Sequence, residues 1–195
     1  LRFINLMGTA AVSAKVYGSM LANIAYVYSI AAAEATQIIL GYMIGAGKLK
    51  EVCPRVWSTI RIALAASELL TLVILIFCDP IYSIFTADPV IHQLGRQILY
   101  VEFALEIGRS INIVMVRGLT TAGDVWYPVT VGIFSMWLVS VGGSWLLGDV
   151  LGWGLAGIWI AMACDECLRG LLFTIRFQRG KWKEKRLVSG LPKQD

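Results

Sequence analysis

Two glutamates and an arginine interrupt a long apolar stretch, in the segment VEFALEIGRSIN at residues 101–112. At 100° per residue of a helix, Glu102, Glu106 and Arg109 fall within about 60° of one another, and Asn112 follows one turn later. Glu106 precedes Arg109 by three residues and is its natural partner, whereas Glu102 has no cation one turn away. We therefore predict one polar stripe in which Glu102 is left free to bind a proton or cation.

A second charged group lies in the segment at 153–177. Asp165 and Glu166 precede Arg169 by four and three residues, so one arginine can serve both carboxylates. Paired charges of this kind commonly tie helices together. We interpret Asp165, Glu166 and Arg169 as structural ion pairs.

Acids outnumber bases within the apolar segments. At comparable depth the bases are Arg109 and Arg169, and the acids are Glu34, Glu68, Glu102, Glu106, Asp165 and Glu166. An isolated charge at the centre of a bilayer costs roughly 2.5–3.5 kcal/mol on insertion scales, so such residues normally face a cavity or a partner. The predicted substrate- or cation-binding set is Glu102, Glu106, Arg109, Asn112, Glu34 and Glu68. Buried ion pairs, and for Asn112 a hydrogen bond between helices, are the alternatives.

The composition indicates that these segments lie in a membrane. The 195 residues are 57% hydrophobic and 15% charged, with a mean hydropathy of +0.70, whereas soluble domains carry about 25% charged residues. Residues 16–33, 69–78, 127–148 and 150–164 contain almost no charge and are apolar all round, unlike the striped helices of soluble proteins. We predict an all-α integral membrane protein.

Five membrane-spanning helices are expected, and the end of a sixth precedes them at residues 1–8. Their expected ranges are 16–44, 55–78, 89–119, 127–147 and 153–177, with a short interfacial turn at 81–87. The predicted organisation is a helical bundle over residues 1–178 followed by a basic tail over residues 179–195.

Charged residues in the connections predict the orientation. Lysine and arginine collect on the cytoplasmic side of a membrane, and here they gather in the 45–55 connection and in the tail. Asp79 and Asp88 lie between the second and third spans and Asp149 between the fourth and fifth, and these two connections, without lysine or arginine, are predicted to lie outside. The C-terminus is then cytoplasmic. Beside a membrane helix, a basic tail favours anionic lipid over nucleic acid as its partner.

Metal and enzyme chemistry are not favoured. Cys164 and Cys167 form a C-x-x-C without a second ligand pair, and His92 is the single histidine of the chain. No catalytic triad can be assembled from these residues. We expect neither an enzyme nor a tightly bound cofactor.

Four blocks in order resemble the C-terminal half of a multidrug and toxic compound extrusion (MATE) transporter. They are EATQIILGYMIGAGKLKEV, IFTADPVI, EIGRSINIVMVRGLTTAGDVWYPV and GLAGIWIAMACDECLRG, and the similarity extends over nearly the whole chain. The resemblance implies helices eight to twelve of a fold with two six-helix bundles. The N-terminal six-helix lobe would then be a partner of this chain.

The resemblance also implies an activity. The family expels small organic cations across the plasma membrane, in bacteria the inner membrane, in exchange for sodium or protons. At the position of the tenth helix that is often acidic in the family, this sequence has Arg109, with Glu106 one turn and Glu102 two turns away. A flippase for a lipid-linked substrate and a non-transporting membrane subunit are the alternative functions.

The orientation can be tested by cysteine labelling in intact cells. Cysteines placed at Lys48 and Lys185 should react only after the membrane is permeabilised, whereas cysteines at Asp88 and Asp149 should react with an impermeant reagent from outside. Labelling of Lys48→Cys in intact cells would contradict the predicted orientation.

Overall fold

The computed structural model describes residues 8–184. The helix end expected at residues 1–8 and most of the basic tail, Lys185 included, therefore lie outside the described residues.

All five expected spans are helical. The elements are α2 (Thr9–Gly45), α3 (Leu49–Ile76), α4 (Cys78–Phe85), α5 (Pro89–Thr121), α6 (Trp126–Ser135), η1 (Met136–Val141), η2 (Ser144–Val150), α7 (Gly154–Gln178) and η3 (Lys181–Glu184). The first span starts earlier than predicted, because apolar and small residues continue the helix back to Thr9. The interfacial turn expected at 81–87 is a short helix, α4. The fourth span is longer than predicted and changes from α-helix to π-helix in η1 and η2.

Local sequence explains where the central helix begins and ends. The Asp88 side chain accepts a hydrogen bond of 2.9 Å from the Val90 N–H, and Pro89 occupies the first turn. At the other end Gly123 has a φ of 89°, a left-handed conformation that glycine adopts without a steric penalty. The cap predicted at Asp88 is confirmed.

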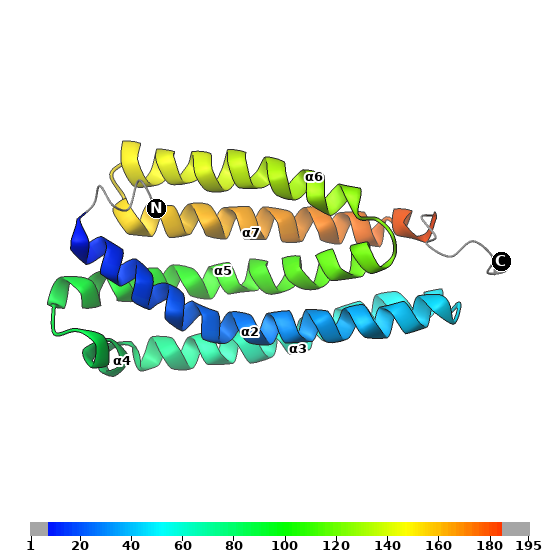
Figure 1. Cartoon of the computed structure of the whole chain (residues 1–195), viewed down its shortest axis with the longest axis horizontal. Helices are drawn as coiled ribbons and strands as arrows, with labels where there is room; N and C mark the ends of the chain where they lie inside the picture. Colours follow the sequence, from blue (N-terminus) through cyan, green and yellow to red (C-terminus); the bar gives the residue numbers. More distant parts are fainter. Residues whose placement is uncertain (1–7, 185–195) are drawn as a thin grey trace.

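The helices form layers around α5. This helix packs against α2 and α3 on one side and α7 on the other, and the fourth span covers the far side of α7. Figure 1 shows the α2–α3 and α5–α6 connections and the C-terminal end at one end of the bundle, and the α6–α7 connection at the other end. The alternation that five crossings require is therefore present. Which end faces the cytoplasm stays a prediction.

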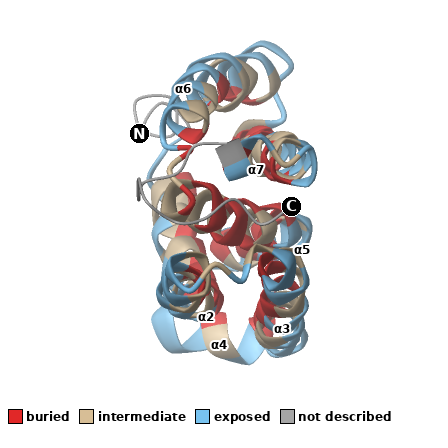
Figure 2. Ribbon diagram, turned by 90° about the vertical axis from the view of Figure 1, so that its right-hand side faces the viewer, coloured by how far each residue is buried: buried red, intermediate tan, exposed pale blue. Residues whose placement is uncertain are grey.

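Among residues 8–184, three helices are long and apolar enough to cross a membrane, at Thr9–Gly45, Leu49–Ile76 and Trp126–Val150. Their outward faces carry large apolar side chains, among them Leu69 at 63% exposure and Leu138 at 78%. In Figure 2 the buried residues gather between the helices and the exposed ones face outward. Lipid is the environment that such a surface fits. Acids and arginines instead accumulate on α5 and α7, which pack against each other inside the bundle.

Two separate apolar clusters fill the interior. One lies at the end of the bundle that contains α4 and includes Tyr82, Leu99 and Trp159. The other lies towards the opposite end and includes Met115 and Phe173. The buried polar residues Ser29, Ser67, Glu106 and Ser110 occupy positions between the two sets along their helices.

Gly108 lets the backbones of α5 and α7 approach each other. A Cβ atom at Gly108 would lie 2.6 Å from the backbone nitrogen of Cys167, which cannot rotate away. Gly108→Ala should therefore destabilise the purified protein by about 1–3 kcal/mol, the usual cost of overpacking. Gly132→Ala is the matched control, because nothing lies within 4 Å of its added Cβ.

Thermal unfolding in detergent measures this difference. Gly132→Ala should leave the midpoint unchanged or raise it slightly, because alanine favours the helix over glycine. Equal midpoints for the two variants would contradict the close approach of the helices.

Candidate functional site

Arg109 is shared by two buried carboxylates on its own helix. Its Nη1 atom lies 2.7 Å from Glu102 Oε1 and 3.0 Å from Glu106 Oε2. Glu102 is 1% exposed and Glu106 is fully buried. The expectation that Glu102 is unpaired is therefore wrong. Helical side chains lean towards the N-terminus of their helix, so the long arginine side chain reaches back two turns as well as one.

The second oxygen of Glu102 is also occupied. Trp159 on α7 donates its indole N–H to Glu102 Oε2 at 2.8 Å. On the α2 side, the guanidinium carbon of Arg109 lies 5.2 Å from the centre of the Tyr26 ring, a cation–π geometry. The carboxylate pair on α5 thus joins α7 and α2 into one site.

Three serines from three helices lead to Glu106. Ser29 Oγ on α2 donates to Glu106 Oε1 at 3.0 Å and lies 2.7 Å from Ser110 Oγ on α5. Ser67 Oγ on α3 lies 3.1 Å from Ser110 Oγ. An ionised carboxylate only accepts, so the hydroxyls are all satisfied if each donates to the next one towards Glu106. Ser110 follows Glu106 by one turn, which is the one trace of this network in the sequence.

Glu68 is the acid that remains without a cation. Both of its carboxylate oxygens are buried and have no hydrogen-bond partner among the described residues. The group lies close enough to Glu106 and Glu102 for their charges to repel it. Glu68 therefore lies near the two carboxylates that share Arg109, without an ion pair to Arg109 itself. The predicted surplus of acids over bases therefore exists. Glu68 is the acid left over at this site, whereas Glu102 is paired with Arg109.

Arg169 organises a second polar group between α5, α6 and α7. Its Nη2 atom lies 2.6 Å from Asp165 Oδ2 and 3.0 Å from Glu166 Oε1, so one arginine serves both acids. Asp165 also accepts from Ser135 of α6. Asn112 of α5 donates its amide to Glu166 Oε2 at 2.6 Å, a hydrogen bond between helices.

Glu34 lies apart from these groups. It is 60% exposed, and its partner is Arg117 at 3.9 Å. The sequence interpretation did not include Arg117 among the bases. The structure thus brings Glu68, Glu102, Glu106 and Arg109 together, places Asn112 with the Arg169 group, and separates Glu34 from both.

A cavity of about 380 Å³ opens beside the shared arginine. Among its lining residues are Tyr26, Glu102, Arg109, Asn112, Trp159 and Glu166. The described residues contain no group of three or more histidine, cysteine or acidic side chains placed to hold a metal ion. The cavity combines buried carboxylates with aromatic walls, a chemistry that suits a proton, a monovalent cation or an organic cation.

The shared arginine makes a prediction about stability. Arg109→Gln leaves both carboxylates without their cation and should destabilise the protein by about 3–5 kcal/mol. Glu106→Gln should cost less, because Arg109 keeps Glu102 as a partner. The double variant Arg109→Gln/Glu106→Gln should recover part of the loss, because one buried charge is removed again. Unfolding midpoints in detergent test this order, and a Glu106→Gln variant less stable than Arg109→Gln would overturn it.

Comparisons with known proteins identify the family. The MatE family model matches residues 1–146. The chain is 32% identical to "Uncharacterized transporter YisQ" of Bacillus subtilis over 94% of its own length and 40% of that protein. It is 24% identical to "Probable multidrug resistance protein NorM" of Thermotoga maritima over 96% of its length and 41% of that protein.

The fold comparison agrees with the family match. The crystal structure of the Vibrio cholerae MATE transporter VcmN in the bent form superposes with a TM-score of 0.82 at 20% identity, covering 94% of this chain and 41% of that one. The chain spans about 40% of the length of these relatives. Together with the five-helix bundle, these matches show that the chain belongs to the MatE family of multidrug and toxic compound extrusion transporters.

Proposed function

We propose that this protein expels organic cations across the plasma membrane by antiport with sodium or protons. The observation that carries the proposal is the buried carboxylate pair that shares Arg109, with the unpartnered carboxylate of Glu68 near it and a cavity of about 380 Å³ beside Arg109. Family membership and the names of relatives such as NorM, a probable multidrug resistance protein, support the direction and the class of cargo.

The roles within the site follow from the partners of each acid. Glu102 and Glu106 are held by Arg109 and by donors from α7 and α2, so both carboxylates are fixed in place beside the cavity. Glu68 has neither a donor nor a cation, and such a group costs least when it is neutral or has bound a cation. Glu68 is therefore the group that takes up and releases the coupling ion.

Transport also requires a second helical bundle. Alternating access in such transporters moves one bundle against another around a central site. This chain supplies one bundle and 40–41% of the length of the relatives YisQ and NorM. We expect the 195-residue chain alone not to pump, and the N-terminal lobe to be needed, with the C-terminus of the assembly in the cytoplasm.

Dye efflux in energised membrane vesicles tests the proposal. The chain is joined to the N-terminal lobe of YisQ and compared with the chain alone, using ethidium as the dye and an imposed proton or sodium gradient. Gradient-driven efflux is expected from the joined protein only. Gradient-driven efflux by the chain alone would refute the need for a second bundle, and none from a well-folded joined protein would refute antiport.

Glu68→Gln tests the role of the unpaired acid. This variant should fold normally, because no hydrogen bond is lost, yet should lower gradient-driven efflux by at least about tenfold. Glu51→Gln is the matched control on the same helix, since Glu51 is exposed in the first turn of α3. If Glu68→Gln pumps normally while Glu102→Gln is folded but inactive, the coupling role belongs to Glu102 after all.

A further inference from the structure

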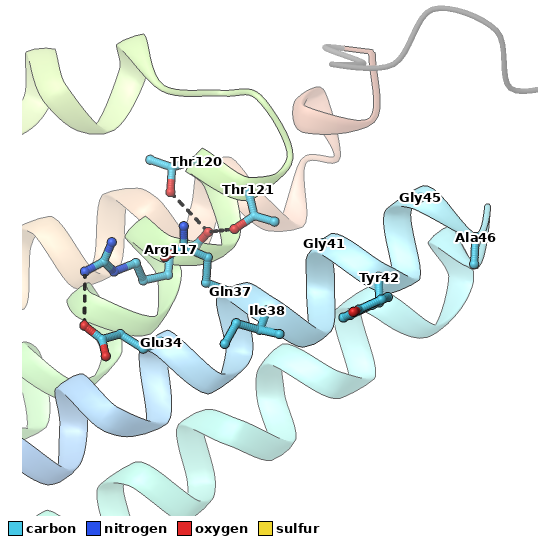
Figure 3. A pocket seen from close by; sticks show the side chains of 10 residues that line it. All are labelled: Glu34, Gln37, Ile38, Gly41, Tyr42, Gly45, Ala46, Arg117, Thr120 and Thr121. Atoms are coloured by element: carbon cyan, nitrogen blue, oxygen red, sulfur yellow. Dashed lines mark hydrogen bonds and ion pairs between the residues drawn. The ribbon is translucent and has the colours of Figure 1, made fainter.

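A second and larger cavity lies between α2 and α5 at the end of the bundle that carries the α2–α3 connection. Its volume is about 1000 Å³, and none of its lining residues belongs to the Arg109 cluster. Figure 3 shows Glu34, Ile38 and Tyr42 along α2, with Arg117 of α5 facing Glu34. We call this cavity the inner groove. It is distinct in place and in lining from the site described above.

The ion pair in the inner groove is loose. Arg117 Nη2 lies 3.9 Å from Glu34 Oε1, whereas the Arg109 and Arg169 pairs have distances of 2.6–3.0 Å. The side chains of Glu34 and Arg117 are 60% and 39% exposed. Exposed pairs of this kind contribute little free energy. Glu34 can therefore exchange Arg117 for another cation at low cost.

The walls of the inner groove are apolar and roomy beside this carboxylate. Ile38 is 63% exposed and Tyr42 is 79% exposed. Gly41 and Gly45 leave the α2 backbone bare, and a Cβ atom added at Gly45 would meet nothing within 4 Å. An exposed aromatic ring, an aliphatic side chain and a carboxylate in one groove are the features that bind a lipophilic cation.

The threonine hydroxyls of the inner groove are not available to an anion. Thr120 and Thr121 line the inner groove, but their hydroxyls donate to backbone carbonyl oxygens of Val116 and Arg117 at 2.6–3.2 Å. Those donors are therefore already used. Arg117 can turn its long side chain towards the aqueous end of the bundle when Glu34 takes another partner.

A third cavity lies between the inner groove and the central site. Its volume is about 550 Å³, and it shares Glu34, Arg117 and Thr120 with the inner groove and Tyr26, Asn112 and Arg169 with the cavity beside Arg109. The three cavities thus adjoin one another along α5.

We propose that the inner groove is a separate binding site for a lipophilic organic cation, in which Glu34 binds the positive charge and Arg117 is a tethered competitor for Glu34. The class of ligand rests on the proposed function. The site itself goes beyond that function, because it lies apart from Glu68, the proposed coupling group, and because Arg117 sets its affinity.

Equilibrium binding of radiolabelled tetraphenylphosphonium to the purified protein tests this site. Arg117→Gln should lower the dissociation constant at least threefold, because the competitor is gone. Glu34→Gln should raise it at least tenfold, and the double variant Glu34→Gln/Arg117→Gln should bind as weakly as Glu34→Gln. The pair is loose, with Glu34 60% and Arg117 39% exposed, so unfolding midpoints should stay within a few degrees of the unsubstituted protein.

Arg61→Gln is the matched control for the loss of a positive charge, since Arg61 is exposed on the neighbouring helix and lies outside the inner groove. The proposal would be overturned if Arg61→Gln lowered the dissociation constant as much as Arg117→Gln does. It would also be overturned if Glu34→Gln left the dissociation constant unchanged. Glu34-dependent binding, together with no gradient-driven efflux by the well-folded protein joined to the N-terminal lobe, would leave this site standing and refute antiport. Gradient-driven efflux, together with tetraphenylphosphonium binding that is unchanged in both Glu34→Gln and Arg117→Gln, would refute this site alone.

Discussion

The sharing of Arg109 between Glu102 and Glu106 is the interaction on which the interior of the bundle depends. Three charges are removed from water here, and removal of one partner from such a group is far more costly than the net contribution of the pair. The arrangement is tolerated because donors from α7 and α2 satisfy the outer oxygens of both carboxylates. The positions of α2, α5 and α7 therefore depend on the one guanidinium group of Arg109.

The same constraint explains why α5 is the central helix. A helix with charges along its length cannot face lipid, so its neighbours must cover it. Glycine at position 108 lets α7 come close enough for Trp159 to reach Glu102, while the spans with few charges turn their apolar faces outward. Between two apolar clusters, the polar residues then form a layer, and the cavity beside Arg109 opens onto Glu102 and Arg109 of this layer.

The sequence predicted those features that depend on one helix at a time. The spans follow from hydropathy, the cap at Asp88 from its neighbouring proline, and the two acids on Arg169 from their spacing of four and three residues. The prediction for Glu102 failed because only partners one turn away were considered, although an arginine reaches two turns back. The serine network and the bond from Trp159 depend on the axial register between helices, which periodicity within one helix does not contain.

Two acids without a tight partner remain, and their surroundings separate their roles. Glu68 is held among other carboxylates without a donor, so any charge it carries must be matched by a small ion or proton that fits the existing space. Glu34 lies in the roomy inner groove, where its one cation among the described residues is the loosely paired Arg117. Its partner can therefore be as large as the groove allows. The two roles that we propose, ion coupling for Glu68 and cargo binding for Glu34, therefore rest on a difference in space and competition rather than in charge.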